Sequence, residues 1–204
     1  MGNRNLEAAN KGIILAIFVI CALPIIGAWW LLQGSEKGET FATRNYGELI
    51  IPARPLGEAT LETLESKKLA IEELREKWTL VVLGPAECNE ICRQNLYETR
   101  QIRLATGKDM HRIQRLWVTN DLSFLDESGW LQEQHPDLIV ASEEKGEEGF
   151  VNQFVLPDVP DPLMAQRVYI IDPIGNLVIS YPPEETPEHM LKDLKRLLFV
   201  SQIG

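Results

Sequence analysis

The chain has 204 residues, enough for one domain with a short appendage and too few for two large domains. It carries 20 lysines and arginines against 30 aspartates and glutamates, which gives a formal net charge of −10 at pH 7. This acidic balance argues against a protein that binds nucleic acid or an anionic lipid surface.

The first element along the chain is an apolar segment at residues 12–32, which reads GIILAIFVICALPIIGAWWLL and contains no charged side chain. About 20 apolar residues suffice for a helix to cross a bilayer, and Trp29 and Trp30 would then lie at the membrane interface. A cleaved signal peptide is the alternative, but its apolar core has only about 7–15 residues and precedes small residues at a cleavage site. We therefore favour an uncleaved transmembrane anchor, in which Cys21 is an inert thiol.

The residues on either side of this anchor predict its orientation. Residues 1–11 contain two basic side chains and one acidic side chain, and this basic excess predicts that the leader stays in the cytoplasm. Residues 33–45 are polar and contain glycine, so we expect a spacer there. Residues 46–204 then form a domain of ordinary size that faces the periplasm from the inner membrane.

The central feature of this domain is a pair of cysteines, Cys88 and Cys92, which follows an apolar run at residues 79–83 and a Gly84-Pro85 break. A short apolar run bounded by turn residues predicts a buried strand. Residues 89–106 are polar and rich in helix formers, so they predict a helix. Both thiols would then lie at the start of a helix, where partial positive charge favours thiolate over thiol.

A structural disulfide is the simplest alternative role for Cys88 and Cys92. In the loop-closure model, so short a loop stabilises a protein by only about 2 kcal/mol, against nearly 5 kcal/mol for a loop of about 100 residues. These two are also the only cysteines outside the apolar segment. We therefore favour a redox or metal-binding role, with Cys88 and Cys92 as the candidate catalytic residues.

The rest of the domain alternates strands and helices. We expect Trp78 and Trp117 in the core and His135 at the surface or a helix end. The order predicts an α/β protein with a thioredoxin-like fold, in which helices flank a mixed central β-sheet. In chain order, we expect a strand at 111–119, a turn at 120–121, a mostly helical stretch at 123–141, a loop at 143–162, a β-hairpin with strands at 168–171 and 177–181, and a helix opened by Thr186-Pro187.

These motifs resemble the Sco/SenC family of membrane-anchored cytochrome oxidase assembly proteins. In that family the two cysteines and a distant histidine bind copper. The resemblance implies a role in building the binuclear copper centre of oxidase subunit II, by delivering copper or by keeping the subunit's cysteines reduced. It covers residues 46–200 and rests on Gly47-Glu-Leu-Ile, Gly84 with Cys88-Asn-Glu-Ile-Cys92, Trp117-Val-Thr-Asn-Asp121 and Tyr169-Ile-Ile-Asp-Pro-Ile-Gly175.

The chain departs from the family pattern at the metal site. The family usually has a proline after each cysteine, but this chain has Asn89 and Arg93, and Met164 occupies the position of the copper-binding histidine. Two thiolates and a thioether would form a soft site selective for Cu(I), which makes Cys88, Cys92 and Met164 the candidate copper ligands. A core-filling methionine is the favoured alternative for Met164. The histidines of the chain lie elsewhere in the sequence, at His111, His135 and His189.

Three functions are compatible with the sequence. The first is a copper chaperone for oxidase assembly, and the second is a thiol–disulfide oxidoreductase that acts on exported cysteines without metal. The third is a non-catalytic scaffold module, against which the cysteine pair counts. We expect an assembly factor for a copper-containing oxidase, with subunit II or another exported thiol protein as its partner, and leave open whether it is an enzyme.

Overall fold

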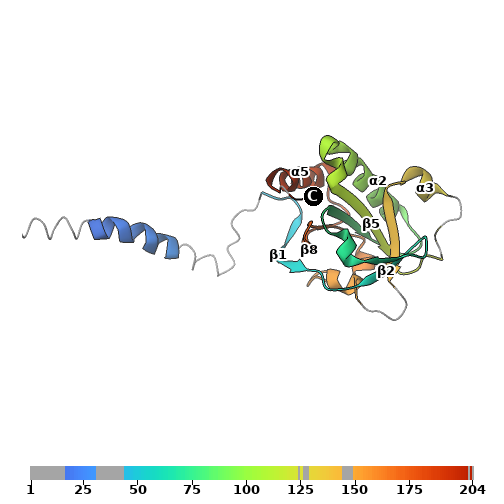
Figure 1. Cartoon of the computed structure of the whole chain (residues 1–204), viewed down its shortest axis with the longest axis horizontal. Helices are drawn as coiled ribbons and strands as arrows, with labels where there is room; N and C mark the ends of the chain where they lie inside the picture. Colours follow the sequence, from blue (N-terminus) through green and yellow to red (C-terminus); the bar gives the residue numbers. More distant parts are fainter. Residues whose placement is uncertain are drawn as a thin grey trace, which may run out of the picture. The chain divides into compact units, whose positions relative to one another are not determined.

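The computed structural model describes residues 17–30, 44–123, 125, 129–143, 149–201 and 203. The chain divides into two compact units, Met1–Arg44 and Asn45–Gly204, and the second contains the sheet (Figure 1). In the first unit residues 17–30 form a helix inside the predicted anchor, while the rest of that anchor, the predicted leader and most of the predicted spacer lie outside the described residues. Among the residues that are described, no helix is both long enough and apolar enough to cross a membrane.

The described part of the second unit is built on one mixed sheet of eight strands. The strands are β1 (Glu48–Pro55), β2 (Thr60–Thr63), β3 (Lys68–Ala70), β4 (Trp78–Leu83), β5 (Ile113–Thr119), β6 (Leu138–Glu143), β7 (Val168–Ile171) and β8 (Asn176–Tyr181). Their order across the sheet is β1-β8-β7-β4-β5-β6-β2-β3. Strands β4, β5 and β6 are parallel, whereas β7 is antiparallel to β4 with Val168 opposite Val82. The carboxyl ends of β4, β5 and β6 therefore share one edge of the sheet with the start of β7.

Helices cover both faces of this sheet (Figure 1). Successive strand residues point to opposite faces, so Leu80 and Val82 of β4 join a buried cluster with α2 and α5, while Val81 and Leu83 join a second cluster with η1 and η3. The helical elements are η1 (Ile71–Leu74), α2 (Glu90–Ala105), η2 (Gly107–Arg112), α3 (Trp130–Gln134), η3 (Val151–Phe154), α4 (Pro162–Ala165) and α5 (Pro187–Val200).

The elements around the cysteines agree with the sequence prediction, and those at the periphery do not. The buried strand, the cysteine helix, the hairpin and the last helix are confirmed. The strand expected at 111–119 begins only at Ile113, because His111 belongs to η2. The stretch expected to be helical at 123–141 is helical only at Trp130–Gln134 among its described residues, and its end forms β6. Strands β1, β2 and β3 were not predicted at all.

The start of the domain is fastened to its last helix by the buried carboxylate of Asp193 in α5. Oδ2 of this residue accepts the backbone N–H groups of Tyr46 and Gly47 at 2.7 and 3.0 Å, and the hydroxyl of Tyr181 at 3.2 Å. Gly47 has no room for a side chain, because a Cβ there would collide with Ile179 and Tyr181. The chain therefore reaches β1 along a path fixed by α5.

Candidate redox site

The two cysteines form a disulfide at the start of α2, directly after the carboxyl end of β4. Their Cα atoms are 5.2 Å apart. Asn89 is the N-cap of α2, and its side chain accepts the backbone N–H of Cys92 at 3.0 Å. Short polar side chains are preferred at this position because they satisfy a helix N–H that has no carbonyl partner. The disulfide therefore lies at the helix N-terminus, as the sequence predicted.

The two sulfur-bearing residues differ in accessibility. Cys92 is fully buried, with 0% of its surface exposed, whereas Cys88 is only partly buried. Arg93 fixes the loop from outside: its Nε donates to the carbonyl of Cys88 at 3.2 Å, and its guanidinium lies 5.1 Å from the ring centre of Trp130. Asn89 and Arg93 occupy the two positions where the Sco/SenC pattern has prolines. Asn89 stabilises the start of the helix as its N-cap, and Arg93 holds the loop by its hydrogen bond to Cys88. A thiol or disulfide from outside would meet Cys88 first.

Met164 lies on the short helix α4, which precedes β7 at the same edge of the sheet as the disulfide. The side chain of Asp161 caps α4 by accepting the backbone N–H of Met164 at 3.1 Å. Asn95, one turn beyond Cys92 in α2, donates from Nδ2 to the carbonyl of Gln166 at 2.7 Å and ties α4 to the cysteine helix. Met164 is 67% exposed, so the expectation that it fills the core is wrong. Its role as a copper ligand stays a prediction.

His111 and His189 contact groups other than the cysteines. His111 is exposed in η2, with Nδ1 2.9 Å from the carbonyl oxygen of Lys108. His189 has Nδ1 2.8 Å from Glu185 and stacks on Tyr46 with ring centres 3.8 Å apart. Within the described residues, no group of three or more His, Cys, Asp or Glu side chains is arranged to hold a metal ion.

His135 belongs instead to a buried polar cluster around Arg115 of β5. Arg115 is fully buried and donates to the carbonyl of Leu96 at 2.5 Å, to Oδ1 of Asp137 at 3.2 Å and to Thr99. Burial lowers the pKa of Arg115 to about 10. Burial and then the charge of Arg115 lower the pKa of His135 to about 4. His135 is the C-cap residue of α3, so the expectation of a helix end is confirmed. It is only 5% exposed, so the expectation of a surface position is wrong.

Two tryptophans of the cluster under α2 and α5 have indole N–H groups without a hydrogen-bond partner among the described residues. Trp78 and Trp117 are 5% and 0% exposed, which confirms that both are core residues. The buried Nε1 atoms of both donate to nothing in the part of the chain that the structure describes. An unsatisfied buried donor costs about 1–3 kcal/mol, so each calls for a reason. Sequence reasoning could not find these atoms, because composition does not show which core donors lack acceptors.

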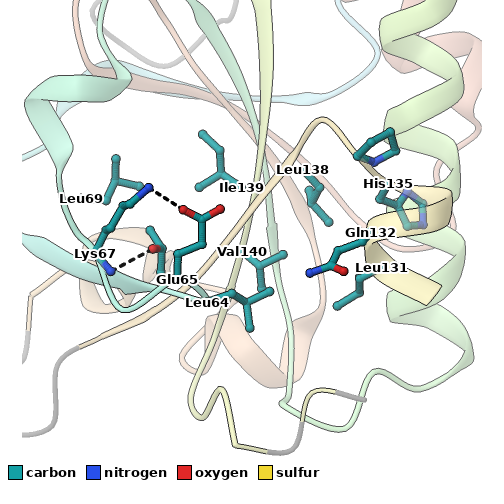
Figure 2. Close-up of a pocket in the computed structure, with 12 residues that line it drawn as sticks. Leu64, Glu65, Lys67, Leu69, Leu131, Gln132, His135, Leu138, Ile139 and Val140 are labelled. Atoms are coloured by element: carbon teal, nitrogen blue, oxygen red, sulfur yellow. Dashed lines mark hydrogen bonds and ion pairs between the residues drawn. The ribbon is translucent and has the colours of Figure 1, made fainter. Parts of the chain in front are cut away.

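A hollow of about 480 Å³ lies elsewhere, beside α3 and the amino end of β6. Figure 2 shows its walls, among them Leu64, Leu69 and Leu138, with the ion pair between Glu65 and Lys67 at 2.6 Å. Strands β4, β5 and β6 run parallel, so the amino end of β6 is at the opposite end of the sheet from the cysteines. This hollow is therefore not part of the redox site.

The strand order, and a disulfide at the start of the helix that follows a central strand, define a thioredoxin-like protein. A family model described as the transmembrane-like, thioredoxin-like, C-terminal domain matches residues 78–201, more than half of the chain, and the chain belongs to this family. No curated protein matches it in sequence.

Solved structures agree on the fold. Yeast Sco1 with copper bound is 17% identical, with a TM-score of 0.59 over 74% of this chain and 95% of that one. ScoI of Bradyrhizobium japonicum with copper bound is 22% identical, with a TM-score of 0.55 over 71% and 99%. The thioredoxin domain of a thiol-disulfide oxidoreductase from Bacteroides vulgatus is 15% identical, with a TM-score of 0.52 over 72% and 98%. Identities this low show a shared fold alone.

Proposed function

We propose that the chain is a membrane-anchored assembly factor for a copper-containing cytochrome oxidase that acts by thiol–disulfide exchange on the cysteines of oxidase subunit II. The observation that carries the proposal is the Cys88–Cys92 disulfide at the N-terminus of α2, with Cys88 accessible and Cys92 buried. Residues 12–32 are the proposed anchor in the inner membrane, with the domain in the periplasm. An alkaline phosphatase fused after residue 45 should be active; activity only of a cytoplasmic reporter at this position would contradict the topology.

The exchange uses only this chain's residues and its partner's disulfide. The Cys88 thiolate, favoured by the helix N-terminus, attacks one partner sulfur, and the other partner sulfur leaves and takes a proton. Cys92 then loses its proton and attacks the Cys88 sulfur of the mixed disulfide, which releases the first partner sulfur as a second thiol. Two electrons pass to the partner, and the chain is left with the Cys88–Cys92 disulfide. An external dithiol reductant returns it to the reduced state.

The test of this mechanism is a trapping experiment with the full chain in detergent and an oxidised fragment of subunit II. The reduced wild-type chain should reduce the fragment's disulfide, and Cys92→Ser should accumulate a covalent adduct through Cys88. Cys88→Ser is the matched control and should form no adduct. A fragment that stays oxidised would overturn the oxidase assignment, and exchange with unrelated exported disulfides at equal rate would favour a general oxidoreductase. Inactivity toward all disulfides would leave the scaffold module.

Copper delivery is the second candidate function, and the exposure of Met164 favours it. A core methionine could not reach a metal, but Met164 is 67% exposed at the sheet edge that also carries the cysteines. By donor chemistry, two thiolates and a thioether suit Cu(I), which would be cargo here, whereas the thioether is a poor ligand for Cu(II). Yeast Sco1 and the Bradyrhizobium protein, which share the fold, were solved with copper bound, and this supports the copper proposal.

The copper proposal turns on this one side chain. The reduced chain should bind Cu(I) and hold Cu(II) poorly, Met164→His should gain Cu(II) binding, and Met164→Leu should leave thiol–disulfide exchange intact. Tight Cu(II) binding by the wild-type chain would show that the third ligand is another residue. No Cu(I) binding would leave exchange as the only function of the cysteines.

A further inference from the structure

The indole N–H of Trp117 and the buried sulfur of Cys92 both lie close to Gly84. A Cβ built on Gly84 would be 3.6 Å from Nε1 of Trp117 and 3.8 Å from Sγ of Cys92. The backbone there is fixed, because the N–H of Gly84 donates to the carbonyl of Val118 at 3.2 Å. With no side chain on Gly84, nothing on that residue separates the donor from the sulfur.

The same N–H has no acceptor while the disulfide is closed, among the residues that the structure describes. A buried donor without a partner is costly, and any change that supplies an acceptor is favoured by that amount. A sulfur held in a disulfide is a poor acceptor. A reduced sulfur accepts hydrogen bonds better, above all when it is ionised. Opening of the disulfide thus makes the sulfur of Cys92, beside Gly84, an acceptor for this N–H.

We propose that Trp117 is a positioning residue for the redox reaction, whose indole N–H donates to the sulfur of Cys92 in the reduced state and stabilises that state. This inference rests on the exchange function proposed above. In the defining equilibrium, two glutathione thiols give two electrons and two protons to the Cys88–Cys92 disulfide, whose S–S bond breaks, and they become oxidised glutathione. Trp117 shifts this equilibrium toward the dithiol without touching the partner.

The first test replaces Trp117 by phenylalanine, which keeps an aromatic ring and removes the donor. In glutathione buffers, the full chain with Trp117→Phe should show an equilibrium constant for reduction about tenfold lower than wild type, equivalent to a potential lower by ~30 mV. Trp78→Phe is the matched control, because the buried N–H of Trp78, in the same cluster, also lacks a partner within the described part of the chain. Trp78 begins β4, roughly 16 Å along the strand from Leu83, and its replacement should leave the equilibrium unchanged.

A second test keeps the donor and fills the gap. Gly84→Ala places a methyl at ordinary contact distances from both groups, so this variant should fold and also favour the disulfide. Because both changes interrupt one interaction, the double variant should lose no more than Trp117→Phe alone. In nuclear magnetic resonance spectra, the indole proton of Trp117 should move downfield on reduction, and that of Trp78 should not.

The outcomes separate the two proposals. A disulfide that never reduces in any glutathione buffer would overturn the exchange function itself. A reducible disulfide with an unchanged equilibrium in Trp117→Phe, an equal shift in Trp78→Phe, or an indole proton that does not move would overturn the role of Trp117 alone.

Discussion

Arg115 and Trp117 are two residues apart on β5, so their side chains lie on the same face of the sheet, and both are fully buried. Arg115 donates hydrogen bonds to α2 and to Asp137, whereas the indole of Trp117 donates to nothing in the described part of the chain. A buried polar group with all its partners holds one conformation in place. A buried donor without a partner gains from a change of state, and Trp117 is the one that lies beside the cysteines.

The largest effect should come from Arg115. Arg115→Met removes the hydrogen bonds from the guanidinium to Oδ1 of Asp137 and to the carbonyl of Leu96, although Asp137 keeps Arg103 at 3.4 Å and Leu96 keeps Thr99 at 3.2 Å. Each hydrogen bond of a charged group contributes about 1.5–3 kcal/mol, so the two together contribute about 3–6 kcal/mol. Urea unfolding should show a loss of that size, while the glutathione equilibrium stays within about twofold, because the cluster does not touch the cysteines. Lys195→Met on the exposed face of α5 is the control and should change the unfolding free energy by less than about 0.5 kcal/mol. A shift of the glutathione equilibrium in Arg115→Met would show that the Arg115 cluster and the surroundings of Trp117 are coupled.

A smaller effect should follow from the pH dependence of His135. Burial is the largest cause of its lowered pKa, followed by the charges of Arg115 and Arg100. Asp137 acts in the opposite direction and favours the charged form. The pKa of His135 is about 4 in the folded chain and about 6.5 when unfolded, so between these values the unfolded state binds the proton first. Stability is therefore lost as pH falls through this window, by about 2 kcal/mol between pH 7 and pH 5.

The variant that isolates this effect is His135→Leu, which cannot titrate. Urea unfolding at both pH values should show a loss about 2 kcal/mol smaller in the variant than in the wild type. Parallel pH profiles of the two proteins would mean that folding leaves the pKa of His135 unchanged.

The smallest effect compares two helix caps, one with its hydrogen bond and one without. The side chain of Asn89 accepts the N–H of Cys92, whereas Thr186 at the start of α5 makes no side-chain cap bond. Asn89→Ala should lower the unfolding free energy of the oxidised chain by about 1 kcal/mol, and Thr186→Ala by less than about 0.5 kcal/mol. Equal losses of the two variants in thermal or urea unfolding would show that the hydrogen bond of the Asn89 cap contributes no stability.

The sequence predicted the elements that surround the cysteines because each has strong local signals. β4 is an apolar run closed by Gly84-Pro85, and Asp172 to Asn176 marks the hairpin turn. The peripheral strands lack such signals. β1 is an edge strand with mostly exposed residues and two prolines, and β3 has three residues. The apolar run of β6 fits a strand and a buried helix equally well, so the sequence predicts helix where the structure has a strand.

Only those residues of the site that are close together in the sequence could be predicted to lie together. Cys88, Cys92 and their helix are one continuous stretch, so strand and helix signals place them together. The proximity of Trp117 to Gly84 depends on the register of β5 against β4, in which Val118 lies beside Leu83. The burial of His135 depends on Arg115 and α2, and the exposure of Met164 depends on how α4 ends. These distances are set by packing between segments, which a single sequence does not encode locally.

The carboxylate of Asp193 has a mechanical consequence. β1 is an edge strand, so a pull on its amino end alone would open its ladder to β8 one hydrogen bond at a time. Tension that enters the domain at Asn45 first meets Tyr46 and Gly47, whose N–H groups are gripped by Asp193 in the middle of α5. The force then acts on a whole packed helix rather than on the rim of the sheet. A force applied at this point therefore reaches α5 before it reaches β4, the strand that leads into the cysteine helix.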